Sequence, residues 1–500
     1  MSLRRRASSS CIFACLAIAC NTPELPAPAL PLFQTPDAPF RTARPPLSVP
    51  SMESNSAPAV QSTTLGNGVT LWVVNRPNVP YVALNLVARD AGTASGAAPG
   101  ERIHLTARSV VEGGTLWEAQ KVVKPPLING EQLGYWSGPA HSAFQLRVLS
   151  ESLPQGLQIL GRTLRSPAFG RGNLDEMRLA ELKQMQDMSN SISDALFEVT
   201  LRAALGKVVA AQVLGENMDE VRSVTPEAIE HCYHQLFRPE TSALIAVGDV
   251  TLEDLLPLAE RELGAWQTPL PRPSMPVPAA PQRLSTKVRV HFLPQSAMAQ
   301  GRVMLLQAAP PTRGATQDEI AFELAADIAA GAISSRSNVS LRHTAGITYG
   351  IEPAFWSSPA LSLLRIEASF ETDEVVRAVS DLQRVLEGLQ ESPVSEPELS
   401  LAKVALLASL ERTEHNNAEL AHYLGFVFAE GKSPEWLAQL PTLIAAISAA
   451  DVQSVARRYL RPRQLEIGVA GPVGLAPALQ ELGELEVYQV HIKQPVPPAD

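Results

Sequence analysis

The chain has 500 residues, more than one hydrophobic core usually supports, so several packed units are expected. It carries 41 Lys and Arg residues against 51 Asp and Glu residues, and this net charge of −10 argues against a surface that mainly neutralises nucleic-acid phosphates. With 45% hydrophobic and 18% charged residues, the body of the chain has the composition of a folded protein.

Residues 1–20 have the order of a secretory signal peptide. Arg4–Arg6 precede the apolar run Cys11–Ala19, which is about half the roughly 20 residues that a membrane-spanning helix needs. Leu16–Cys20 resembles a bacterial lipobox, which implies acylation of Cys20 and a periplasmic protein anchored to a membrane. Asn21 is not the aspartate associated with inner-membrane retention, so the outer membrane is preferred. The alternative is that Cys20 is the last residue of an ordinary signal peptide.

Proline-rich segments divide the rest of the chain. Nine of the thirty residues 21–50 are Pro, so residues 21–60 are predicted to be an extended tether. A second proline cluster at 268–284 is predicted to link a first half, 61–267, to a second half, 285–493, before a tail at 494–500. Only Cys232 lies in the body, which excludes an internal disulfide in the mature chain.

The two halves repeat a pattern at their ends. Leu236-Phe237-Arg238-Pro239 is followed after nine residues by Gly248, and Tyr459-Leu460-Arg461-Pro462 is followed after nine residues by Gly471. The glycines are 223 residues apart, and the pairs Ser166-Pro167 and Ser392-Pro393 are 226 residues apart. A nearly constant offset over this distance indicates a duplication.

The first half begins with strand and helix signals. Asn67-Gly68 before Val69–Val74 predicts a tight turn and a strand, and Tyr81–Val87 predicts a second strand. Apolar residues then recur with helical spacing before Gly113-Gly114, at Ile103, Ala107, Val110 and Val111.

The second half opens in the same way. Val288–Phe292 and Gly301–Gln307 predict strands, and Ile320, Leu324 and Ile328 predict the inward face of a helix. Strands separated by long paired helices indicate an α+β fold with antiparallel sheets and flanking helices.

Several ordered motifs carry a family resemblance. They are Leu65–Leu71, Gly113–Thr115, Ser334–Arg336, Leu341-Arg342 and Gly346–Gly350. Together they resemble the insulinase/pitrilysin family of zinc peptidases, M16, over about residues 62 to 490. The resemblance implies two homologous halves, each a duplicated α/β unit of the M16/LuxS-like metallohydrolase fold, that close on a peptide-sized chamber.

Active members of that family need H-x-x-E-H, whose two histidines hold zinc while the glutamate activates water. Counted back from Gly114, these positions fall on Leu105, Arg108 and Ser109. Leu105 has no lone pair, Arg108 is a permanent cation and Ser109 is a poor zinc ligand. This chain is therefore expected to have no zinc site of the family type and to bind no cofactor itself.

Other titratable residues offer weaker alternatives. His104 and Glu112 supply two ligands where a catalytic zinc site needs three. Glu230-His231 with His234 lacks the H-E-x-x-H order, so these residues are interpreted as a surface group. His415 and His422 are seven residues apart, are expected on one helix, and are interpreted as ordinary polar residues.

The second-half motif implies a different contribution. In the family, the residues matching Arg342 and Tyr349 donate hydrogen bonds to the scissile carbonyl as it becomes an oxyanion, and neither side chain must titrate near neutral pH to do so. The alternative is that both side chains only form hydrogen bonds with backbone groups at the edge of a sheet.

The leading hypothesis is a subunit without its own zinc that pairs with a zinc-bearing M16 homologue, as a heterodimer, to hydrolyse peptides. The second is a non-enzymatic peptide-binding or scaffold protein of the cell envelope. The third is a peptidase with an unconventional metal site, and nucleic acid is not an expected partner.

Overall fold

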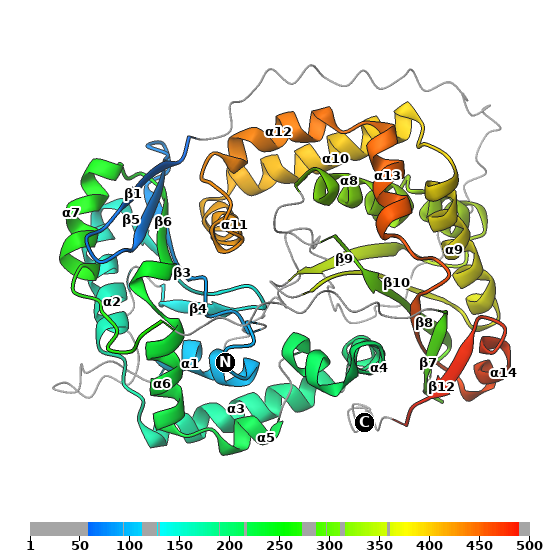
Figure 1. The fold of residues 1–500 in the computed structure, drawn as a ribbon, viewed down its shortest axis with the longest axis horizontal. Coiled ribbons are helices and arrows are strands. Elements are labelled where there is room, and N and C mark those ends of the chain that lie inside the picture. The colour runs from blue at the N-terminus through cyan, green and yellow to red at the C-terminus, as the bar shows by residue number, and fades with distance from the viewer. Residues whose placement is uncertain are drawn as a thin grey trace, which may run out of the picture.

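The computed structural model of the chain describes residues 59–93, 95–112, 128, 131–189, 191–214, 218–272, 287–296, 298–310, 316–357 and 361–489. These residues form two halves, each built on a six-stranded sheet with flanking helices (Figure 1). Cys20, Gly113–Thr115 and the proline-rich linker from residue 273 lie outside the described ranges. Within those ranges, no helix combines the length and the apolar character needed to cross a membrane.

The first sheet has the strand order β1-β2-β6-β3-β5-β4. Its strands are β1 (Gln61–Thr64), β2 (Thr70–Asn75), β3 (Tyr81–Ala88), β4 (Gly134–Ser137), β5 (Ser142–Leu149) and β6 (Ser242–Gly248). The turn predicted at Asn67-Gly68 joins β1 to β2, and Gly68 adopts φ 97°, a conformation that favours glycine. The Asn67 amide group also donates hydrogen bonds to the carbonyl oxygens of Leu263 (2.9 Å) and Trp266 (3.0 Å).

The second sheet has the strand order β12-β7-β11-β8-β10-β9. Its strands are β7 (Arg289–Pro294), β8 (Gln300–Ala308), β9 (Ile351–Ser357), β10 (Ser362–Glu371), β11 (Glu466–Gly471) and β12 (Glu484–Val487). The run β2-β6-β3-β5-β4 thus has the same order of chain segments as β7-β11-β8-β10-β9. The internal repeat inferred from the sequence is therefore visible in the topology. Gly248 is the last residue of β6, and Gly471 is the last residue of the equivalent strand β11.

The α+β fold with two halves is confirmed, with one difference in the sheets. Most strand pairs are antiparallel, but β6 runs parallel to β2, and β11 runs parallel to β7. In each half the returning strand follows a long helical crossover, which lets it enter the sheet in the same direction as the first core strand. The pair β12–β7 is also parallel.

Helices follow in matching order in both halves. The first half has α1 (Gly100–Glu112), α2 (Leu153–Arg165), α3 (Arg171–Ser189), α4 (Ile192–Leu214), α5 (Met218–Ser223), α6 (Pro226–Leu236) and α7 (Leu252–Leu263). The second half has α8 (Thr316–Ala326), α9 (Val375–Glu391), α10 (Glu396–His415), α11 (Asn417–Ala429), α12 (Trp436–Ala446), α13 (Ala449–Tyr459) and the short α14 (Ala476–Leu479).

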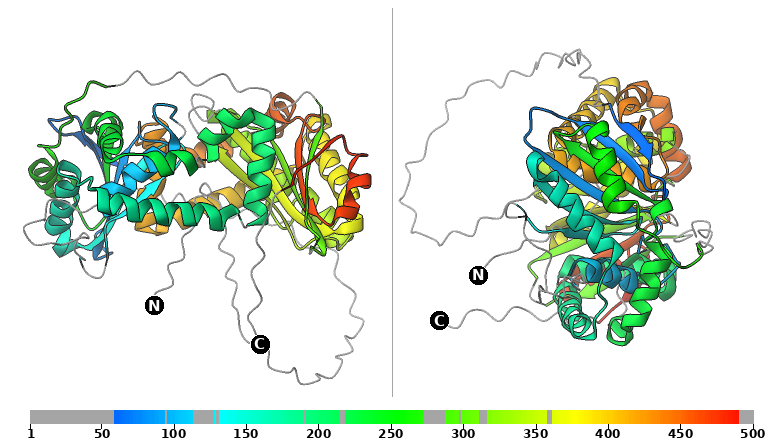
Figure 2. Two further views of the ribbon diagram at one scale, coloured as in Figure 1. Left: turned by 90° about the horizontal axis from the view of Figure 1, so that it is seen from below. Right: turned by 90° about the vertical axis from the view of Figure 1, so that its left-hand side faces the viewer.

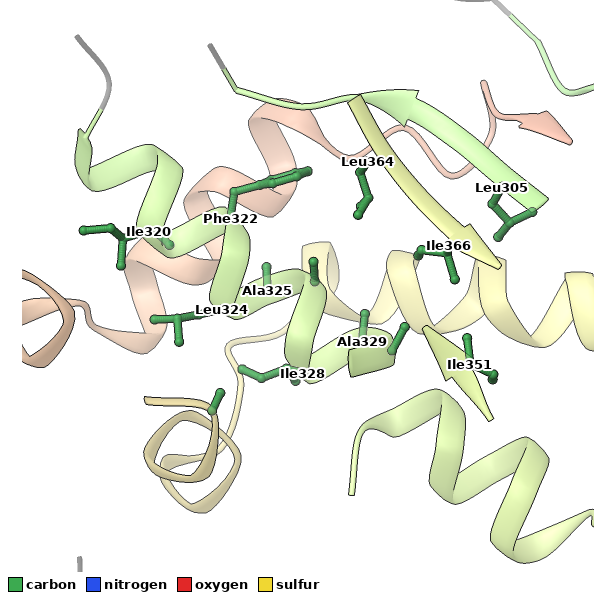
Figure 3. Close-up of a cluster of buried hydrophobic side chains, with 14 of the residues drawn as sticks. Leu305, Ile320, Phe322, Leu324, Ala325, Ile328, Ala329, Ile351, Leu364 and Ile366 are labelled. Atoms are coloured by element: carbon green, nitrogen blue, oxygen red, sulfur yellow. The ribbon is translucent and has the colours of Figure 1, made fainter. Parts of the chain in front are cut away.

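Both faces of the central strands in each sheet are buried, which explains why several strands are apolar without interruption. Along β8, Val303 and Leu305 face the helices of their own half, while Met304 and Leu306 belong to separate clusters on the opposite face. The segment α8 with its π-helical continuation Asp327–Gly331 covers the first of these faces (Figure 3). Ile320, Leu324 and Ile328 point inward there, as the sequence predicts.

The opposite face of each sheet is covered by a helix from the other half. Helix α11 packs on β3 and β6 of the first sheet, and α4 packs on β11, β8 and β7 of the second (Figure 1). Viewed from below, the two halves lie at opposite ends of the molecule with helices running between them (Figure 2). A Cβ on Gly425 would lie 2.8 Å from Asn85 Nδ2, and one on Gly468 would lie 2.4 Å from Thr200 Oγ1. Glycine at these positions permits the close approach of helix and sheet.

Candidate functional site

Helix α1 buries the three residues that stand where the zinc motif would be. Leu105 is fully buried in a small apolar cluster. That cluster consists of Leu105, Leu174, Met177, Met185, Val221, Val224 and Ile229, from α1, α3, α5 and α6 with the segment between the last two. Ser109 is also buried, and its hydroxyl group lies 3.7 Å from the Met177 sulfur. This side of α1 is thus packed against neighbouring helices.

Arg108 forms the centre of a charged network on the same helix. Its Nε donates a hydrogen bond to Glu112 Oε2 (2.8 Å), and its Nη1 donates to Glu181 Oε2 on α3 (3.2 Å). His104 Nε2 lies 3.2 Å from the same oxygen of Glu181. Burial opposes the charge of Arg108, but the hydrogen bond to Glu112, reinforced by nearby charges including Glu181, leaves the pKa of Arg108 raised. Arg108 therefore remains a cation between two carboxylates.

This donor set does not fit a catalytic zinc ion. Leu105 offers no ligand, and the carboxylates of Glu112 and Glu181 are engaged by the Arg108 guanidinium. The alternative site at His104 and Glu112 meets the same obstacle, because Arg108 lies between them in the network. In the described part of the chain, no group of three or more His, Cys, Asp or Glu residues is arranged to hold a metal ion.

Arg342 and Tyr349 lie on one anchored segment before the edge strand β9. Arg342 belongs to the π-helical segment Asn338–Thr344, and Tyr349 follows in the connection to β9. Arg342 is exposed and the Tyr349 side chain is 92% exposed. Among the described residues, neither side chain has a hydrogen-bond or ion-pair partner, so both present unused donors to solvent.

Buried residues hold this segment in place. Leu341, next to Arg342, is fully buried in the core of the second half. The Asn338 amide group donates to the carbonyl oxygens of Ala330 (3.1 Å) and Ala332 (3.0 Å), and its oxygen accepts from Ile351 N (3.2 Å). The segment therefore has a fixed base beneath its exposed side chains.

Arg336, from the same sequence motif, has a structural role. Its Nε donates to Glu398 Oε1 on α10 (2.7 Å), and its Nη2 donates to Oε2 (3.2 Å). The hydrogen bond from Arg336 lowers the pKa of Glu398 to about 2. Glu398 also forms the capping box at the start of α10 with Ser395, so Arg336 ties this segment to that helix.

The structure does not assemble the remaining histidine candidates into a site. Glu230 and His231 are exposed on α6, and burial lowers the pKa of the half-buried His234. The expectation that His415 and His422 share one helix is wrong: His415 ends α10, and His422 lies on α11. The break occurs at Asn416, whose side-chain oxygen accepts hydrogen bonds from the Ala418 and Glu419 amides and starts a new helix.

Two further polar groups were not anticipated from the sequence. His141 is fully buried beside His422 where α11 meets the first sheet. On α8 and its continuation, burial raises the pKa of Glu319 to about 7, of Glu323 to about 8 and of Asp327 to about 6. The spacing of the three acids by four residues was a usable sequence signal, whereas His141 carried none.

Comparison with known proteins gives a consistent result. The family described as "Peptidase M16 inactive domain" matches residues 223–406. The human "Cytochrome b-c1 complex subunit 1, mitochondrial" is 24% identical over 135 residues, a match that spans 27% of this chain and only 28% of the human protein. The "Mitochondrial-processing peptidase subunit beta" of Blastocladiella emersonii is 19% identical over 84% of this chain and 90% of its own length.

A solved structure shows the same fold over most of the chain. The "peptidase M16 inactive domain from Pseudomonas fluorescens" superposes with a TM-score of 0.72 at 18% identity, covering 83% of this chain and 98% of the other. The family match lies in the segment that carries Arg342 and Tyr349, and the fold extends the likeness to both halves. Residues 223–406 thus match the M16 inactive-domain family, and the described chain has the fold of M16 peptidases.

Proposed function

We propose that this chain is the zinc-free subunit of a two-chain M16 metallopeptidase. In this proposal, a zinc-bearing homologue supplies the metal and the base, and this chain supplies Arg342 and Tyr349. The observation that carries the proposal is that both side chains are exposed, without a partner among the residues that the structure describes, on a segment with a buried base.

The two donors suit the chemistry of amide hydrolysis. When a nucleophile attacks a peptide carbonyl, negative charge develops on the carbonyl oxygen, and fixed donors aimed at that oxygen lower the barrier. Arg342 would offer the N–H donors of a guanidinium, and Tyr349 would offer the O–H donor of a phenol. Both would act by hydrogen bonding to the substrate oxygen while remaining in one protonation state.

In this proposal, helix α1 is the reason for a partner. The Arg108 guanidinium holds Glu112 and Glu181, and Leu105 and Ser109 are packed into the helix contacts. This chain alone would therefore lack both the metal and the base. The likeness to a mitochondrial-processing peptidase subunit, named as one chain of a larger enzyme, supports a shared active site more than it supports an isolated scaffold.

The proposal places the complex in the bacterial periplasm. Residues 1–20 would direct export, and acylation of Cys20 would attach the chain to the outer membrane through the tether at 21–60. Metabolic labelling with a radioactive fatty acid should mark the wild type but leave Cys20→Ser unlabelled. A Cys20→Ser variant that retains the label would contradict the anchor.

Pairing can be tested by purification of the tagged protein from its native envelope fraction. The proposal predicts that a homologue with an intact H-x-x-E-H motif co-purifies at about one to one by quantitative mass spectrometry. A tagged protein that emerges without any such homologue, under conditions that preserve other envelope complexes, would contradict it.

A further inference from the structure

Four aromatic rings meet where α11 of the second half packs on the first sheet. Trp136 on β4 and His141 in the turn before β5 come from the first half, and His422 and Phe426 come from α11. The ring centroids of Trp136 and His141 are 4.5 Å apart, and those of His141 and Phe426 are 4.7 Å apart. His422 lies 5.2 Å from Trp136 and 5.0 Å from Phe426. One histidine from each half is thus enclosed by the same two aromatic rings.

His141 is buried without any hydrogen-bond partner. The side chain is 0% exposed, and neither ring nitrogen has a partner among the described residues. His422 differs, because its Nδ1 lies 2.9 Å from the Gln145 amide nitrogen on β5. Nearby, Asn85 donates to the Ala421 carbonyl oxygen (2.9 Å). An extra proton on His141 would have no acceptor in this arrangement, which makes the charged form costly.

The charged groups on the surrounding elements are engaged elsewhere. After β3, Asp90 pairs with Arg272 (3.0 Å), and the Arg89 guanidinium lies over the Phe428 ring. On β5 Arg147 pairs with Glu131, and on α11 Glu419 accepts from Asn416 (3.2 Å). The Tyr423 phenol, also on α11, has a raised pKa because it is buried. In the described ranges, no carboxylate forms an ion pair with His141 or His422.

Helix α11 is bounded by two changes of backbone direction. Asn416 has extended torsions (φ −111°, ψ 114°) and separates α11 from α10. Gly431, shortly after the end of α11, adopts φ 74°. Glycine tolerates this left-handed conformation, and both points offer places where the chain can bend.

We propose that this contact is an acid-sensitive latch between the two halves, in which protonation of His141 and His422 releases α11 from the first sheet. The inference stands apart from the proposed peptidase function, because it depends only on the contact between the halves.

The direction of the pH effect follows from the two environments. Burial, followed by the charge of His422, holds the pKa of His141 well below its usual range, and burial lowers the pKa of His422 to about 4. In a released state both rings would regain ordinary values of about 6.5. The latch is therefore strongest above that pH and weakens as the pH falls toward 4. At pH 5.5 each ring favours release by about tenfold, and the two together by about 100-fold.

The reciprocal contact, made by α4, has a different polar arrangement. His291 on β7 is fully buried there, but its Nε2 lies 2.7 Å from Glu466 Oε2. Arg289 pairs with the same carboxylate and donates to the Ala203 carbonyl oxygen of α4 (3.0 Å). The buried histidine of this contact therefore has a carboxylate partner, which His141 lacks among the described residues. Acid should therefore loosen the α11 contact while the α4 contact persists.

Hydrogen exchange of the mature full-length protein can test the latch. Protection factors, corrected for the intrinsic pH dependence of exchange, would be measured by mass spectrometry at pH 7.5 and 5.5. We expect peptides covering α11 and residues 134–149 to lose protection by about 10–100-fold at pH 5.5, while peptides from β8 and β10 keep theirs. Unchanged protection of α11 in the wild type would overturn the proposal.

Variants of His141 and His422 test whether these two rings cause the loss of α11 protection in acid. His141→Phe and His422→Phe keep an aromatic ring and remove the titration, so each should reduce the loss of α11 protection by about tenfold. His415→Asn, at an exposed position that ends α10, is the matched control and should behave as the wild type. If His141→Phe does not fold, His422→Phe makes the same test. A folded variant at either position that responds to acid as strongly as the wild type would contradict the assignment.

Discussion

Arg108 on α1 donates a hydrogen bond to Glu181 on α3 across 3.2 Å, and these residues are only 7% and 8% exposed. Arg108 stands at the position that the family resemblance matches to the glutamate of the zinc motif. The positive charge beside Glu181 is the guanidinium of Arg108, a buried side chain of the same chain. Glu181 is thereby held by an internal cation, and α1 is joined to α3.

Removing that cation should destabilise the protein. Arg108→Leu would remove the cation that binds the buried Glu181 carboxylate, and we expect a loss of about 2–4 kcal/mol in the free energy of unfolding. Urea denaturation followed by circular dichroism measures this loss. The double variant Arg108→Leu/Glu181→Leu should recover part of the stability, because it removes the buried carboxylate together with its cation.

A surface pair provides the control for this prediction. Arg222 and Asp219 form an ion pair in which the side chains are 57% and 90% exposed. Arg222→Ala should change the free energy of unfolding by less than about 1 kcal/mol. Equal losses for Arg108→Leu and Arg222→Ala would contradict the role given to the buried network.

The acidic row on α8 predicts a pH-dependent stability. Burial raises the pKa of Glu323 to about 8, whereas in the unfolded chain it would be near 4.5. The native state therefore binds a proton that the unfolded state lacks, and this contribution to stability is lost as the pH rises from 4.5 to 8. Relative to the wild type, Glu323→Gln should gain about 1–4 kcal/mol between pH 5 and pH 9.

Thermal denaturation at several pH values checks this gain. Glu411→Gln, at an exposed position on α10, removes a carboxylate without this burial and should show no comparable trend. If the stability difference between Glu323→Gln and the wild type is the same at pH 5 and pH 9, the raised pKa is wrong.

The close approach of α11 to the first sheet predicts a cost for any side chain at residue 425. In Gly425→Ala, the new methyl group would lie 2.8 Å from Asn85 Nδ2 and 3.0 Å from Val87 Cγ2, so the helix must shift. We expect a loss of about 1–3 kcal/mol in the free energy of unfolding, measured by urea denaturation. Gly474→Ala, where nothing lies within 4 Å, should change stability little; an equal loss there would contradict the packing argument.

Much of the fold could be predicted from local sequence signals. The turn at Asn67-Gly68 and the strand Tyr81–Ala88 follow from residue preference and apolar patterning alone, and both form as expected. The repeat at Gly248 and Gly471 likewise predicts equivalent strands. These features depend on residues that are close in sequence, so a local pattern contains the required information.

Local sequence signals could not predict that α4 covers the sheet of the second half and that α11 covers the sheet of the first half. An apolar helix face shows that the helix is covered, but not which sheet covers it. Uninterrupted apolar strands are typical of a sheet that is buried on both faces, but they do not show that the second cover comes from the other half. His141 was missed for the same reason, because only α11, more than 270 residues away, completes its burial.

The candidate site also has some features that the sequence predicts and others that only the fold shows. Family spacing identified Leu105, Arg108 and Ser109 before the fold was known, but the partners of Arg108 come from the structure, since Glu181 is 73 residues away in sequence. The exposure of Tyr349 also required the fold, because an aromatic residue followed by a glycine fits a buried turn equally well.

Peptide turnover by the purified two-chain complex tests directly whether Arg342 and Tyr349 act in peptide hydrolysis. The account predicts that Arg342→Ala and Tyr349→Phe each lower kcat by about 10–1000-fold while zinc content and subunit stoichiometry stay unchanged. Arg412→Ala, an exposed arginine at the end of α10, should turn over substrate at the wild-type rate. Full activity of both the Arg342 and the Tyr349 variants would contradict the account.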